Sequence, residues 1–155
     1  MVKIRCFRGY LAKKDECDKV IAPAYEKMPA EEARQTAEEN PMSFLNVNKI
    51  EAELAADQIP HTPVAVQHVA QDALPHFITE GWLVQDDLAT MYIYQQTRGT
   101  HVQQGILALT SVQDYENQRI KRHESTLSQK ERDLTILTNV QSANTSPVFL
   151  TFKDN

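Results

Sequence analysis

The chain has 155 residues, of which 41% are hydrophobic and 24% are charged, and its formal net charge is −5. This length suits one compact domain, and the composition excludes a disordered or fibrous chain. The acidic balance argues against a protein held on nucleic acid by phosphate contacts, and no apolar run reaches the roughly 18 residues of a membrane span. We therefore expect a single cytoplasmic domain, residues 1–155, with no nucleic-acid and no membrane partner.

The first third of the chain predicts two strands and one helix. Apolar and charged side chains alternate over 2–7, which indicates a strand with one covered face. Residues 12–28 show no periodicity and predict a long ordered loop. The acidic residues that follow Pro29 favour a helix that ends at Asn40. Residues 43–47 predict a short strand.

The central segment predicts a long helix followed by a brief strand. Thr62 and Pro63 suit the N-cap and first position of a helix that Gly81 ends. Pro75 lies inside this pattern and lacks a backbone N–H, so we expect a kink or break near 71–74. Trp82 opens the strand that follows.

The last third predicts a hairpin, a short helix, a longer helix and a terminal strand. Residues 90–97 should pair with 101–112, and a helical turn should follow. Ser128 and Glu131 form a capping-box pattern, which predicts a helix from 128 to about 142. Its inward-facing residues should be Leu134, Leu137 and Val140, and residues 147–152 predict a strand. This order of elements predicts an α+β fold with a largely antiparallel mixed sheet, a β-hairpin and about three helices packed on it.

The sequence predicts no metal site and leaves the cofactor unknown. The two cysteines form no CxxC pair. His68, Asp72 and His76 share a helical spacing, but the two histidines stand roughly 12 Å apart and cannot hold one metal ion. A solvated helix face is the alternative for these residues.

A dense polar stretch between 114 and 133 holds the candidate site. A cationic cluster before a helix N-terminus favours phosphate or carboxylate, and a His beside a Glu can transfer protons near neutral pH. The alternative is a solvated charged turn. The candidate catalytic residues are His123 and Glu124, and the candidate anion-binding residues of this stretch are Lys121, Arg122, Lys130, Glu131 and Asp133.

Seven segments in order resemble the N-terminal part of the bacterial domain-of-unknown-function family 1015. They are KIRCFRG at 3–9, IAPAYE at 21–26, NPMSFL at 40–45, EGWLVQD at 80–86, DYEN at 114–117, IKRHE at 120–124 and NTSPVFL at 144–150. The resemblance implies an N-terminal half of longer proteins, whose later part is similar to the ParB/sulfiredoxin-like superfamily that includes free-serine kinases. His123 and Glu124 match the family's KHE motif, and Lys130, Glu131 and Asp133 match the segment after it. Tyr25 falls on the family's PPYD-like motif, and the resemblance adds it to the anion-binding candidates.

This chain departs from the family at several polar positions. Leu127 and Leu134 stand where relatives carry Arg, and Leu137 stands where His is common. Asn46 replaces a His, and Glu26 replaces an Asp. Leucine can neither carry charge nor donate a hydrogen bond, so these replacements predict a lost anion contact.

We therefore expect a non-catalytic or ligand-binding module with a small-molecule phosphate or nucleotide as ligand. The alternative is a part of a free-serine-like kinase or another nucleotide-dependent phosphotransferase, and whether the chain is an enzyme stays open. Apolar surface left by a missing C-terminal half would favour self-association, so we expect a homo-oligomer.

Overall fold

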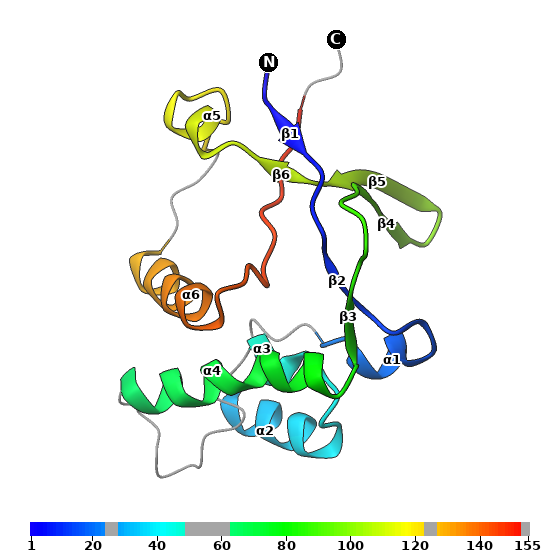
Figure 1. Ribbon diagram of the computed structural model, residues 1–155, viewed down its shortest axis with the longest axis vertical. Helices are drawn as coiled ribbons and strands as arrows, with labels where there is room; N and C mark the ends of the chain where they lie inside the picture. The colour runs from blue at the N-terminus through cyan, green and yellow to red at the C-terminus, as the bar shows by residue number, and fades with distance from the viewer. Residues whose placement is uncertain (24–27, 49–62, 123–126, 153–155) are drawn as a thin grey trace. The chain divides into compact units, whose positions relative to one another are not determined.

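The computed structural model describes residues 1–23, 28–48, 63–122 and 127–152 (Figure 1). These residues form short strands and both short and long helices. The elements are β1 (Ile4–Arg5), β2 (Tyr10–Ala12), a 3-10 turn (Lys14–Glu16), α1 (Cys17–Val20), α2 (Ala30–Glu39), α3 (Leu45–Asn48), α4 (Pro63–Thr79), β3 (Leu83–Gln85), β4 (Tyr92–Arg98), β5 (His101–Leu107), β6 (Leu109–Thr110), α5 (Val112–Glu116) and α6 (Ser128–Gln141).

The chain divides into two compact units. Unit 1 comprises Met1–Leu11 with Val84–Ser125, and unit 2 comprises Ala12–Leu83 with Thr126–Asn155. Both units are therefore built from segments far apart in the sequence. The expectation of one domain that equals the N-terminal half of longer proteins stays a prediction.

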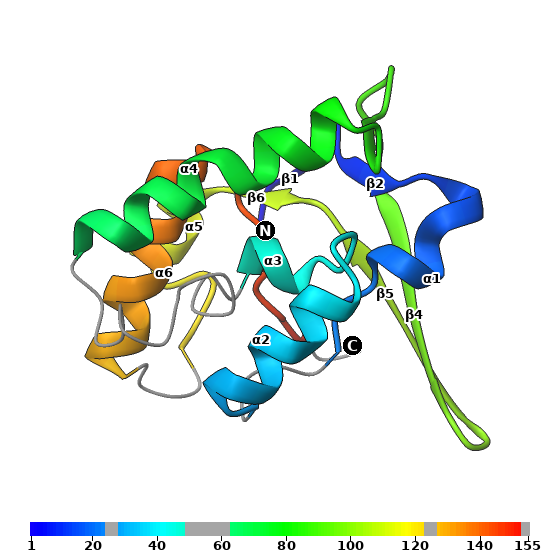
Figure 2. The same cartoon turned by 90° about the horizontal axis from the view of Figure 1, so that it is seen from below.

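Unit 1 is built mainly of strands. β1 pairs with β6 antiparallel, and Phe7 forms an isolated antiparallel bridge with Thr90. β4 and β5 form a ribbon (Figure 2), and their tight turn contains Gly99 at φ 59°, a left-handed conformation that glycine adopts without strain.

Unit 2 is built mainly of helices around one apolar cluster. Phe77 of α4 lies at its centre, 1% exposed, with edge-on ring contacts to Phe44 and Trp82 at centroid distances of 6.0 and 5.0 Å. α4 also packs against α6. The buried members of the cluster are Val20, Val47, Ala73, Leu74, Phe77 and Leu83.

A smaller cluster explains why α2 forms. Its buried residues Ala33 and Ala37 lie one turn apart and pack with Leu45 of α3. Alanine has the highest helix propensity, and Glu31 forms an ion pair with Arg34 at 2.8 Å on the helix surface. The predicted helix between Pro29 and Asn40 is confirmed.

The α+β class, the hairpin and the three longer helices α2, α4 and α6 are confirmed, but the sheet differs from the prediction. The described strands form three separate two-stranded sheets, with the orders β1-β6, β2-β3 and β4-β5. The helix count also differs, because α1 and α3 are additional short helices within the described residues, whereas α5 is the helical turn expected after the hairpin.

Two predictions in the first third of the chain are wrong. The expected loop over 12–28 contains a 3-10 turn and α1, and 43–47 contains the start of α3 and no strand. A short apolar run fits a strand or a buried helix equally well. The helical form prevails here because Ser43 is buried and its Oγ accepts a hydrogen bond from the Leu45 N–H at 3.4 Å.

Of the kink or break expected near 71–74, the break is absent. α4 runs without interruption from Pro63 to Thr79 (Figure 1). Proline removes one backbone hydrogen bond, but Ala73, Leu74 and Phe77 bury their side chains around it, and this burial offsets the loss. The expected N-cap, Thr62, lies outside the described residues.

At the C-terminal end, three further details differ. α6 begins at Ser128, so its N-cap is Leu127. Leucine has no polar side chain, and the expected capping box between Ser128 and Glu131 does not form. Leu134 is exposed although it was expected inward. Residues 147–152 form no strand, and Val148, Phe149 and Phe152 are exposed.

Candidate functional site

The loop that follows α5 is folded by its own backbone. The N–H groups of Arg119 and Ile120 both donate to the carbonyl oxygen of Asp114, at 2.8 and 3.0 Å. Gln118 adopts a left-handed conformation at φ 57° and lets the chain reverse direction. The loop therefore returns residues 119–122 to the end of α5.

A buried carboxylate ties this loop to the residue that precedes β1. Asp114 Oδ2 accepts a hydrogen bond from the backbone N–H of Lys3 at 2.8 Å, and Oδ1 accepts one from Arg119 Nη1 at 2.9 Å. These donors, the Lys3 N–H first, hold the pKa of Asp114 below its usual value. Asp114 thus positions the loop.

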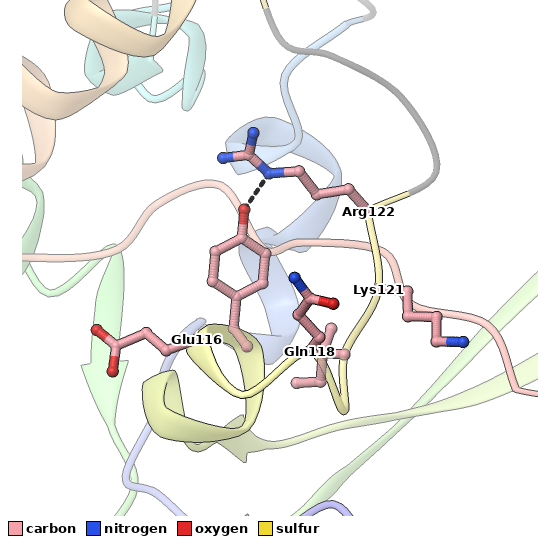
Figure 3. A pocket seen from close by; sticks show the side chains of 6 residues that line it. Glu116, Gln118, Lys121 and Arg122 are labelled. Atoms are coloured by element: carbon pink, nitrogen blue, oxygen red, sulfur yellow. Dashed lines mark hydrogen bonds between the residues drawn. The ribbon is translucent and has the colours of Figure 1, made fainter.

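The returning loop and the end of α5 border an open surface cavity of about 620 Å³ (Figure 3). The lining residues include two cations, one carboxylate, one amide and one aromatic ring. They are Tyr115, Glu116, Gln118, Ile120, Lys121 and Arg122.

The best-positioned polar group in this cavity is Arg122. Its Nε donates a hydrogen bond to Tyr115 Oη, and its guanidinium carbon lies 5.6 Å from the centroid of that ring. Both contacts restrict the planar guanidinium, which is the side chain best suited to bind phosphate or carboxylate. The side chains of Glu116 and Lys121 extend in opposite directions, and both point away from the Arg122 guanidinium (Figure 3).

The structure places only some of the predicted site residues. Lys121 and Arg122 line the cavity. Glu131 and Asp133 are exposed on α6, which belongs to unit 2, and Lys130 is described only as a position in that helix. The catalytic candidates His123 and Glu124, and the anion-binding candidate Tyr25, lie outside the described residues.

The family departures fall in different environments. Leu127 and Leu134 are exposed, so neither supports the apolar core. Asn46 is buried, and its amide donates to the carbonyl oxygen of Pro41 at 3.0 Å. Asn46 therefore holds the turn before α3.

Sequence reasoning did not identify Tyr115, Glu116 and Gln118 as site residues. Tyr115 and Arg122 are seven positions apart and meet only because the chain reverses at Gln118. A positive φ at glutamine has no sequence signature, but the DYEN segment at 114–117 could have directed attention to Tyr115. Within the described residues, no group of three His, Cys, Asp or Glu side chains is placed to hold a metal ion.

Comparison with known proteins gives one result. The profile of the family described as Protein of unknown function (DUF1015) matches residues 4–155. No curated protein and no solved structure matches the chain.

Proposed function

Since the chain belongs to the family described as Protein of unknown function (DUF1015), we propose its function from the cavity beside α5. The chain acts as a ligand-binding module without catalysis of its own, and it takes a small phosphate-bearing ligand or nucleotide. The observation that carries the proposal is the Arg122 guanidinium, held on the Tyr115 ring inside a cavity that Lys121 also lines.

The physical argument concerns positioning. An arginine that is already restrained loses less side-chain entropy when it binds an oxyanion, and its planar group can form two parallel hydrogen bonds to phosphate oxygens. Gln118 supplies amide donors from the same lining. Glu116 lines the cavity as well, and its carboxylate repels a simple anion.

The presence of Glu116 therefore favours a ligand with both signs of charge. A phosphorylated amino acid presents a phosphate to Arg122 and an ammonium to Glu116, whereas inorganic phosphate offers only the first contact. We expect phosphoserine to bind more tightly than phosphate or serine alone.

Two further aspects belong to the proposal. The exposed leucines Leu127 and Leu134 support the absence of catalysis, because leucine can neither carry charge nor donate a hydrogen bond where the family resemblance implies arginine. Cys6 and Cys17 are free thiols, which supports a cytoplasmic location because that compartment keeps thiols reduced. Within the described residues, no helix has the length and apolarity needed to cross a bilayer.

The test is a thermal-shift screen with ATP, ADP, serine, phosphoserine and inorganic phosphate. Binding to the folded state raises the melting temperature by mass action. We expect a shift in the parent and its loss in a Lys121→Ala/Arg122→Ala double variant. The matched control is Lys13→Ala/Lys14→Ala, which removes two adjacent exposed cations from unit 2 and should keep the shift.

Two results would contradict this function. The first is a cooperatively melting parent with no shift for any ligand. The second is a shift of equal size in the parent and in the Lys121→Ala/Arg122→Ala variant, since that would place the ligand elsewhere.

A further inference from the structure

The start of the chain contacts the segment that carries the candidate site. In the β1–β6 sheet Ile4 stands opposite Thr110, and the backbone N–H of Lys3 donates to Asp114 Oδ2 at 2.8 Å. Asp114 lies in α5, which follows β6 along the chain. All of these residues belong to unit 1, so the link lies within one unit.

The Lys3 N–H holds one oxygen of a carboxylate whose other oxygen holds the loop. Asp114 Oδ1 accepts a hydrogen bond from Arg119 Nη1 at 2.9 Å, and the Asp114 carbonyl oxygen accepts from the N–H groups of Arg119 and Ile120. The side chain of Asp114 is only 3% exposed. A buried carboxylate that loses a donor is left incompletely paired, so the chain around it has to move until water replaces that donor.

A movement at Asp114 reaches Arg122 along a short stretch of chain. The hydrogen bonds from Arg119 and Ile120 to Asp114 fix the returning part of the loop, and Arg122 lies at its end. The bond from Arg122 Nε to Tyr115 Oη joins this end to the residue next to Asp114 (Figure 3). The guanidinium therefore stays on the Tyr115 ring only while Asp114 keeps the loop folded.

We propose that the backbone N–H of Lys3 controls the affinity of the cavity for its anion, because it holds Asp114 and thereby the Arg122 guanidinium in the binding position. Lys3 and Asp114 act as positioning residues. This inference rests on the proposed function and adds the regulation of the same site. A partner that draws β1 away from β6 lowers the affinity for the ligand.

Replacement of Lys3 tests the N–H separately from the side chain. Lys3→Pro removes the ammonium and the backbone N–H, whereas Lys3→Ala removes the ammonium alone. Isothermal titration calorimetry with phosphoserine should show binding that is roughly fivefold or more weaker in Lys3→Pro than in Lys3→Ala. Equal affinities in the two variants would overturn the proposal.

Asp114→Asn tests the same link without a change in β1. Asparagine has a single side-chain oxygen, so it cannot offer separate oxygens to Lys3 and Arg119. Its affinity for phosphoserine should again fall roughly fivefold or more. The control Asp87→Asn makes the same change at an exposed position of unit 1 and should bind like the parent. If Asp114→Asn binds like this control, the proposal is wrong, even where Lys3→Pro fails to fold.

A measurement without ligand separates failure of this inference from failure of the proposed function. In proton–nitrogen correlation spectra, the Nε–H signal of Arg122 reports its contact with Tyr115. This signal should keep its position in Lys3→Ala and move toward that of an unstructured arginine in Lys3→Pro. A signal that moves in this way while the parent binds no phosphoserine supports the link from Lys3 to Arg122 and refutes the proposed function. A signal that stays in place in Lys3→Pro overturns the inference, whatever the parent binds.

Discussion

The Phe77 side chain gives the sharpest test of how unit 2 is stabilised. It is 1% exposed and holds two edge-on aromatic contacts, to Phe44 and Trp82. Phe77→Ala removes the burial and leaves a cavity, which should lower the free energy of unfolding by about 3–5 kcal/mol. Phe77→Leu keeps most of the burial and loses the ring contacts, so it should lower that free energy by about 1–2 kcal/mol.

These values translate into melting temperatures. For a chain of this length, 1 kcal/mol corresponds to about 2–4 °C, so Phe77→Ala should melt roughly 6–20 °C lower and Phe77→Leu roughly 2–8 °C lower. Circular dichroism melts and urea titrations measure both effects. Val148→Ala is the control, because that side chain is 80% exposed and outside any helix or strand. The reasoning fails if Phe77→Ala costs no more than Val148→Ala, or if Phe77→Leu costs as much as Phe77→Ala.

Three predictions concern unit 1. Gly9→Ala should lower the free energy of unfolding by about 1–3 kcal/mol in urea titrations, since a Cβ there would lie 2.8 Å from Tyr92 Oη; an unchanged urea midpoint would refute the close approach. The Asp114 pKa is lowered in the folded state by the Lys3 N–H, so its stabilisation is present above about pH 3.9 and is lost as the pH falls through the folded-state pKa. In Asp114→Asn, the free energy of unfolding should depend less on pH in the acid range than in the parent. A variant whose free energy of unfolding falls as steeply as the parent's at low pH would count against this account. The Tyr92 pKa is raised, first by the hydrogen bond that its hydroxyl donates to Asp86 at 2.5 Å. The contribution of Tyr92 to the free energy of unfolding is therefore complete below about pH 10, and it is lost as the pH rises through the folded-state pKa. Tyr92→Phe should abolish this alkaline loss in the same titrations, and a variant that keeps it would exclude Tyr92 as the cause.

Local chemistry was sufficient for the elements whose signals lie within a few residues. Alanines and an acidic first turn predict α2, and a glycine turn predicts the β4–β5 hairpin. These signals act through contacts between residues close in sequence, so they can be recognised without the structure. The family membership followed from motifs spread along the chain, and it too was confirmed.

Other features depended on neighbours distant in sequence. The run 43–47 could form a strand or a helix, and burial of Leu45 against α2 selected the helix. The apolar segment 147–152 suits a strand, but a strand needs a paired neighbour, and the described residues supply none.

The candidate site shows the same division. The charges of Lys121 and Arg122 were visible along the chain, and they predicted an anion-binding loop. The contact between Arg122 and Tyr115 was not visible, because it depends on a reversal at Gln118 and on the anchoring of Asp114 by the Lys3 N–H, 111 positions away. Residue types and spacing specify which chemistry a chain carries and where regular elements start, whereas long-range hydrogen bonds and burial determine which of those groups meet.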